Sequence, residues 1–164
     1  MKTIVILLFL FVSLPKAHEY ESICKGLEKE FAVNSGEFFG YITEDNHLIV
    51  SYWGNFYKVE SKALQPFNGK LYAKVDVSQT YKGQIENRLG KFIPIKATIH
   101  SHNPQCLNKG ESGLDEIGSE DLAFAKRYKS VSHYIYGCGG MAQYDETGFV
   151  KVEISPLRIC EKWM

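Results

Sequence analysis

The sequence has no surplus of charge of either sign. Its 164 residues contain 19 Lys and Arg side chains against 19 Asp and Glu side chains. Residues 1–17 hold two of the lysines and no acidic residue, so the rest of the chain has a net charge of about −2. Electrostatic binding of nucleic acid or of anionic lipid needs a basic surplus. We therefore expect neither as a partner.

The sequence also lacks a hydrophobic run long enough for a stable membrane span. The apolar run Ile4–Leu14 is shorter than the roughly 20 residues that a transmembrane helix needs. It follows Lys2 and precedes Ala17, and this order of charge, apolar run and small residue is typical of a signal peptide. We expect residues 1–17 to be cleaved and the protein to be secreted or periplasmic. An uncleaved N-terminal anchor is the alternative.

No internal repeat, low-complexity segment or domain linker divides residues 18–164, which we interpret as a single domain. The patterns predict an order of elements with few helices. The expected helices are 20–31 and 119–128, with one turn near 84–88 in a long connection over 61–91; the expected strands are 38–43, 47–53, 92–100, 131–136, 141–144 and 149–154, with 56–60 as a candidate third strand. This order predicts an α/β (α+β mixed) fold, a mixed sheet with helices packed on it.

Cysteine is scarce, with four residues at positions too irregular for a zinc finger: Cys24, Cys106, Cys138 and Cys160. Four cysteines in an exported chain favour two disulfide bonds. Cys24 with Cys160 and Cys106 with Cys138 is one of three possible pairings. Cys106 as a metal ligand is the alternative.

The most informative motif is His100-Ser101-His102 at the end of an apolar strand. Residues i and i+2 of a strand point to the same face, and neutral imidazole is the commonest nitrogen ligand of Zn²⁺. Asp121, near the start of the predicted helix 119–128, is the candidate third ligand, with Asp115 as the alternative. A chance pair of histidines on a solvated strand end is the other interpretation.

A hydrolytic metal site also needs a carboxylate that takes a proton from water and returns it to the leaving group. Glu37 is the favoured candidate, because it begins a strand and precedes Phe38-Phe39-Gly40, where the glycine indicates close packing. The competing carboxylates are expected to be solvated residues of loops and helices. They are Glu44, Glu60, Glu111 and Glu120.

Together these residues resemble the JAB/MPN (JAMM) metalloproteases, whose motifs are Glu-x-x-Gly, His-x-His-Pro and Ser-x-x-Asp and whose fold is similar to that of cytidine deaminases. Over about residues 30–154 the chain is similar to a bacterial JAB-like branch, a domain of unknown function at the ends of large secreted toxins. Two features depart from the pattern. Pro104 comes one residue later than the proline of the His-x-His-Pro motif. If Asp121 is aligned with the aspartate of Ser-x-x-Asp, Gly118 takes the serine position, whereas Ser112-Gly113-Leu114-Asp115 matches that motif literally.

The resemblance implies that His100, His102 and Asp121 bind Zn²⁺ and that Glu37 acts as general base and acid. Ser119 or Ser112 would stabilise the oxyanion, and the substrate would be a peptide, an isopeptide or a peptidoglycan amide. A catalytically silent JAB-like binding or toxin-associated module is the second hypothesis. A zinc deaminase is a third, but Pro104-Gln105-Cys106 has no second cysteine in register.

Overall fold

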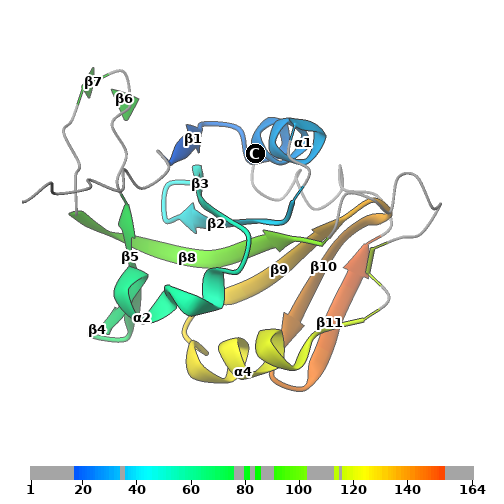
Figure 1. Cartoon of the computed structure of the whole chain (residues 1–164). Coiled ribbons are helices and arrows are strands. Elements are labelled where there is room, and N and C mark those ends of the chain that lie inside the picture. Colours follow the sequence, from blue (N-terminus) through cyan, green and yellow to red (C-terminus); the bar gives the residue numbers. More distant parts are fainter. Residues whose placement is uncertain are drawn as a thin grey trace, which may run out of the picture.

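The computed structural model describes residues 17–33, 36–75, 80–81, 84–85, 91–102, 113–114 and 116–153. The fold is mixed α/β, dominated by one large sheet with few helices (Figure 1). The predicted signal peptide lies outside the described residues except for Ala17, which is buried beside Ile49 and Val75. Among the described residues, no helix combines the length and the apolar character that crossing a membrane would require.

The large sheet has nine strands, and most neighbours in it run antiparallel. Its main path is β1-β3-β2-β8-β9-β10-β11, while β5 also pairs with β8, and β4 pairs with β5. The strands are β1 (His18–Tyr20), β2 (Phe38–Thr43), β3 (Leu48–Trp53), β4 (Leu64–Phe67), β5 (Lys70–Val75), β8 (Lys91–Ser101), β9 (Ser132–Gly137), β10 (Gly140–Asp145) and β11 (Gly148–Glu153); β6 (Thr80–Tyr81) and β7 (Gln84–Ile85) form a separate pair.

Strand β8 is the centre of the sheet, because it pairs with three other strands. It runs antiparallel to β2 and β5 and parallel to β9. Parallel neighbours need a crossover connection, and helix α4 (Ser119–Arg127) lies in the one between β8 and β9. The end of β8, the start of α4 and the start of β2 are thereby brought to one region of the molecule.

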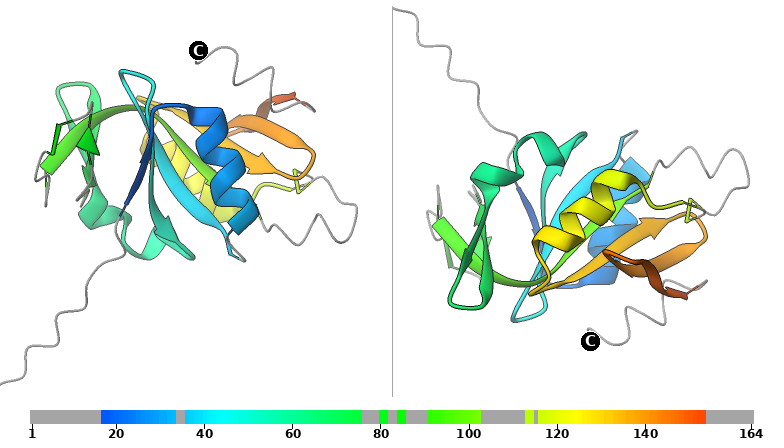
Figure 2. Two further views of the ribbon diagram at one scale, coloured as in Figure 1. Left: turned by 90° about the horizontal axis from the view of Figure 1, so that it is seen from above. Right: turned by 90° about the horizontal axis from the view of Figure 1, so that it is seen from below.

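Helices α1 (Ile23–Val33) and α4 cover opposite faces of the sheet (Figure 2). Ile23, Leu27 and Phe31 of α1 recur every four residues and pack on one face. Phe124 of α4 packs on the other face, against Phe39 and Tyr41 of β2. Alternation along β2 therefore assigns even-numbered residues to the α1 face and odd-numbered residues to the α4 face.

Gly40 allows β2 and β3 to approach closely. A Cβ atom at this position would lie 2.8 Å from the backbone oxygen of Ile49. A side chain there would push the two strands apart, because a backbone atom cannot swing away. The close packing expected around Gly40 is thus found next to the start of β2, where Glu37 lies.

Three predictions of secondary structure were wrong. A helical turn was expected near 84–88, but Gln84–Ile85 is strand β7. Residues 56–60 form no strand but the 3₁₀ helix η1 (Phe56–Lys58) and the beginning of α2 (Glu60–Ala63). The connection 61–91 contains the hairpin β4–β5, with a turn at Asn68-Gly69 where both residues have positive φ (49° and 74°). Asn-Gly is a strong hairpin signal, so this element was readable from the sequence.

Of the four cysteines, Cys24 and Cys138 lie in the described part of the chain, and both are disulfide-bonded. Cys106 and Cys160 lie outside the described residues. The pairing of Cys24 with Cys160 and of Cys106 with Cys138 remains a prediction.

We expect no free thiol in the oxidised protein, because all four cysteines should be paired. Thiol titration in denaturant without reductant measures this directly, and peptide mapping identifies the pairs. Two reactive thiols per chain would contradict the prediction and would restore Cys106 as a candidate metal ligand.

The buried carboxylate of Glu30 in α1 links this helix to β1 and β3 through hydrogen bonds. Glu30 of α1 is fully buried, and its Oε1 accepts hydrogen bonds from Tyr20 Oη (2.6 Å) and from His18 Nδ1 (2.5 Å). Its Oε2 accepts one from Trp53 Nε1 at 3.3 Å. Burial raises the pKa of Glu30, but the hydrogen bonds from Tyr20 and His18 outweigh it and hold the pKa below its ordinary value.

This lowered pKa predicts acid sensitivity. A group whose pKa is lower in the folded state stabilises the fold above its unfolded pKa, and the contribution is lost as the pH falls through the folded pKa. Glu30→Gln should therefore lower the free energy of unfolding by about 1–3 kcal/mol at neutral pH, and its difference from the wild type should shrink below about pH 4.5. Denaturant unfolding at several pH values measures this. Glu28→Gln, on the exposed side of the same helix, is the matched control, and equal losses in both variants would contradict the role of Glu30.

Candidate functional site

Three side chains from β8 and α4 gather at the α4 face of the sheet. His100, His102 and Asp121 each offer one ligand atom, and these atoms all lie within 4.8 Å of one another. His100 Nε2 is 3.3 Å from Asp121 Oδ1, and the centroids of the two imidazole rings are 5.3 Å apart. This group can hold a metal ion.

The strand register explains why both histidines face α4. His100 is the partner of Phe39 on β2, and the two rings stack with centroids 6.2 Å apart. His102 lies two residues further on, so it projects from the same face. Its backbone N–H donates to Tyr136 O of β9 at 2.9 Å, which extends the pairing past the formal end of β8.

Backbone atoms orient two of the three ligand side chains. His102 Nδ1 donates to Gly113 O at 2.8 Å, because a carbonyl can only accept, and this leaves Nε2 as the ring nitrogen available to a metal. Asp121 is the third residue of α4, and its Oδ2 accepts a hydrogen bond from the N–H of Gly118 at 3.0 Å. Asp121 Oδ1 accepts a hydrogen bond from the hydroxyl of Tyr57. Such partners fix ring and carboxylate orientation in metal sites.

His100 fits a metal ligand on its own chemistry. The side chain is buried, and neither ring nitrogen has a hydrogen-bond partner within the described part of the chain. Burial lowers the pKa of His100 to about 4, although Asp121 opposes the shift, so the imidazole is neutral at neutral pH. An unpaired buried polar atom costs about 1–3 kcal/mol. A bound cation would offset that cost at one nitrogen.

Glu37 lies next to this group and on the same face of the sheet. Its carbonyl accepts the N–H of Gly54 at 2.8 Å, and the next residue, Phe38, donates its N–H to Ser101 Oγ at 2.9 Å. These bonds tie the start of β2 to β3 and to the His100-Ser101-His102 segment. Partial burial raises the pKa of Glu37, Asp121 adds to the increase, and His102 opposes it. A carboxylate with a raised pKa is suited to taking up and returning a proton.

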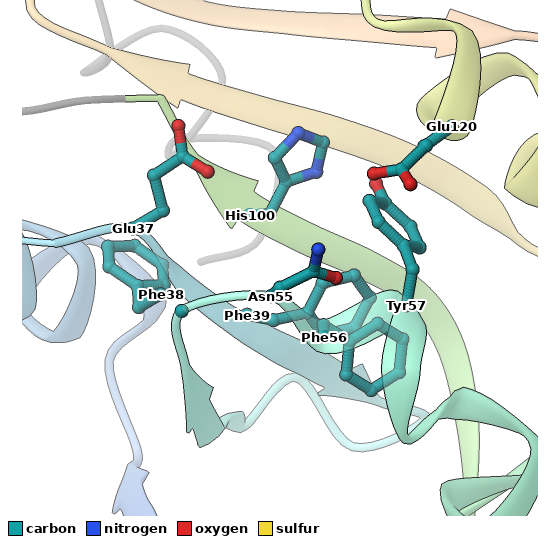
Figure 3. A pocket seen from close by; sticks show the side chains of 9 residues that line it. Glu37, Phe38, Phe39, Asn55, Phe56, Tyr57, His100 and Glu120 are labelled. Atoms are coloured by element: carbon teal, nitrogen blue, oxygen red, sulfur yellow. The ribbon is translucent and has the colours of Figure 1, made fainter.

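A cleft of about 240 Å³ opens beside these residues (Figure 3). Its walls are mainly aromatic, and Phe39 and Phe56 stack with centroids 3.6 Å apart. The carboxylate of Glu37 and the imidazole of His100 rise to the same side of the sheet in Figure 3. The residues lining the cleft are Glu37, Phe38, Phe39, Gly54, Asn55, Phe56, Tyr57, His100 and Glu120.

Sequence reasoning missed Tyr57 and Asn55, because it treated 56–60 as a strand. Burial is the largest cause of the raised pKa of Tyr57, followed by Tyr144 and the bond to Asp121, so the phenol is protonated at neutral pH. Glu120 is exposed, as expected, but it also lines the cleft. No local motif identifies these residues, since they meet the histidines only through the fold.

The other candidates are not brought to the site by the described structure. Asp115, Ser112, Cys106 and Glu111 lie outside the described residues. Ser119 is exposed in the first turn of α4 and does not line the cleft. Glu44 pairs with Lys70 on the surface. Glu60 was expected to be solvated, but it is buried and forms an ion pair with Arg127.

The geometry predicts one divalent metal ion per chain. His102→Ala and Asp121→Asn should each abolish stoichiometric binding, because each removes a ligand atom from the group, whereas Asp115→Asn should leave it unchanged. Titration with Co²⁺ or Zn²⁺ followed by metal analysis measures this. His47→Ala is the control histidine, since His47 pairs with Glu19. Full metal content in Asp121→Asn would remove Asp121 as the third ligand.

Comparison of the chain with models of protein families, with curated proteins and with solved structures gives no match. The similarity to JAB/MPN proteins therefore rests on the motif residues alone. The geometry around His100, His102, Asp121 and Glu37 carries the argument for function.

Proposed function

We propose that this chain is a secreted or periplasmic zinc-dependent metallopeptidase or amidohydrolase with a JAB/MPN fold. The observation that carries the proposal is the placement of Glu37 on the same face as His100, His102 and Asp121, in the lining of a cleft that it shares with His100. Ligands and a proton-transfer group are thus separate residues of the same site.

The ligand group favours zinc. Two neutral imidazoles and one carboxylate are the donors that Zn²⁺ takes in hydrolytic sites, where a fourth position stays open. Bound Zn²⁺ would polarise a carbonyl and lower the pKa of a bound water towards about 7. Within the described residues, neither ring nitrogen of the buried His100 has a hydrogen-bond partner, which supports a cation at this place.

The residues of the chain account for the proton transfers of amide hydrolysis. Glu37 takes a proton from the attacking water, whose oxygen forms the new bond to the carbonyl carbon while the carbonyl oxygen gains the electron pair. As that pair returns, the C–N bond breaks and Glu37 gives the proton to the leaving nitrogen. The products are a carboxylic acid and an amine. The raised pKa of Glu37 supports both transfers.

The arrangement of the motifs supports the JAB/MPN assignment. The glutamate precedes a strand with a glycine in close contact, the His-x-His segment ends the neighbouring strand, and the aspartate is in the first turn of the following helix. The aromatic walls of the cleft suit an extended chain segment. A peptide, an isopeptide and a peptidoglycan stem all present such a segment.

A catalytically silent JAB-like binding or toxin-associated module is the second candidate. One observation favours it: Gly118, without a hydroxyl, takes the serine position three residues before Asp121. Such a module would retain the fold and the cleft without turnover.

Glu37→Gln separates the two candidates. The amide is nearly the same size as the carboxyl but cannot shuttle a proton, so turnover should fall by roughly 10²–10⁴ while zinc content and melting temperature stay unchanged. The assay is hydrolysis of a panel of peptides, Lys-linked isopeptides and peptidoglycan fragments by the zinc-loaded protein. Glu44→Gln, at an exposed ion pair, is the control. Undiminished hydrolysis by Glu37→Gln would exclude Glu37 from the mechanism, and binding without hydrolysis by the wild type would favour the silent module.

A further inference from the structure

We propose that Tyr57 is a catalytic residue of this site and that its phenol O–H stabilises the oxyanion formed on the substrate carbonyl. This proposal rests on the amide hydrolysis proposed above. It assigns to a residue of η1 a role that the sequence motifs gave to Ser119 or Ser112.

The reaction needs such a donor, because negative charge develops on the carbonyl oxygen when water attacks. Most polar side chains around the cleft cannot supply it. Glu37, Glu120 and Asp121 are hydrogen-bond acceptors when ionised, and no lysine or arginine is among the described residues that line the cleft.

The serine position does not supply the donor either. Gly118 has no side chain, and its N–H is used by Asp121 Oδ2. Ser119 is exposed and lies away from the cleft lining. Ser101 is buried, and its Oγ accepts the N–H of Phe38, on the other face of the sheet.

Tyr57 carries the only hydroxyl among the described residues lining the cleft. That hydroxyl donates to Asp121 Oδ1, the same oxygen that lies 3.3 Å from His100 Nε2. The phenol oxygen is therefore adjacent to the ligand atoms. Rotation about the C–O bond can redirect the hydrogen from Oδ1 to a substrate oxygen without movement of the ring.

The tyrosine ring is held in place before substrate arrives. It packs edge-on against Phe124 of α4, with centroids 5.5 Å apart, and against Phe56 at 6.1 Å. A fixed donor loses little reorganisation energy when charge develops. His100 also carries one N–H, but its ring belongs to the candidate ligand group. Asn55 is the remaining neutral donor in the described lining, and it is exposed and makes no side-chain cap bond at the start of η1.

The decisive variant is Tyr57→Phe, which keeps the ring and its packing and removes only the hydroxyl. With saturating Zn²⁺, kcat on an amide substrate from the panel should fall roughly 10²–10³-fold, with KM and the pH profile little changed. Tyr52→Phe is the matched control, because Tyr52 also contacts Phe56 but lies outside the cleft lining.

A binding measurement tests the same bond without turnover. Inorganic phosphate serves as a tetrahedral oxyanion probe of the Co²⁺-loaded protein, followed through the visible spectrum. Loss of a charge-assisted hydrogen bond should raise its Kd about 10–100-fold in Tyr57→Phe, and Tyr52→Phe should match the wild type.

Three results would overturn the assignment. If weaker Zn²⁺ binding explained the whole defect and excess Zn²⁺ restored kcat, Tyr57 would only position Asp121. If Tyr57→Phe kept wild-type kcat and phosphate affinity while Asn55→Ala lost both, the donor would be Asn55. A wild-type chain that binds no zinc or hydrolyses none of the panel would refute the hydrolase proposal itself, and Tyr57 with it.

Discussion

The antiparallel register between β2 and β8 is the constraint on which the site depends. Phe39 pairs with His100. Glu37, two residues before Phe39, and His102, two residues after His100, therefore project from the same face, which α4 covers. Because side chains alternate with period two, a slip of one residue would turn the histidines towards α1 and leave Asp121 without partners. The bond from Phe38 N to Ser101 Oγ ties these two strands together where they reach the cleft, and Gly40 lets β3 pack closely on the other side of β2.

The parallel pairing of β8 with β9 adds the third side chain of the candidate ligand group, Asp121. It requires a crossover, and α4 supplies it on the face where His100 projects. Asp121 enters the site as part of the helix start itself, since one carboxylate oxygen caps the N–H of Gly118 and the other turns towards His100. Folding and ligand placement therefore use the same residue. His100 is buried, and within the described structure neither of its ring nitrogens has a hydrogen-bond partner, an arrangement that costs stability.

Local pattern was enough to identify what lies along single strands and helices. The spacing of His100 and His102, the helix-start Asp121 and the strands predicted over 38–43 and 92–100, observed as Phe38–Thr43 and Lys91–Ser101, all follow from periodicity of two or from capping preference. Tyr57 and Asn55 could not be found this way, because they reach the cleft from a short 3₁₀ helix whose position is set by packing against β2 and α4. The hairpin β4–β5 is a different case. Its Asn68-Gly69 turn and its alternating Leu71 and Ala73 were visible, but the Lys, Gln, Asn and Gly content of residues 61–91 favoured a long connection instead.

The contact of His102 Nδ1 with the carbonyl of Gly113 has a further consequence for how the site tolerates change. The acceptor belongs to the main chain, so the bond depends on the backbone conformation at position 113. Gly113 has a φ of 71°, a conformation that other residues adopt only with strain. Any other residue here would therefore disturb the orientation of the His102 imidazole without touching it through a side chain. Related chains with the same site should keep this glycine even where its neighbours in the sequence differ.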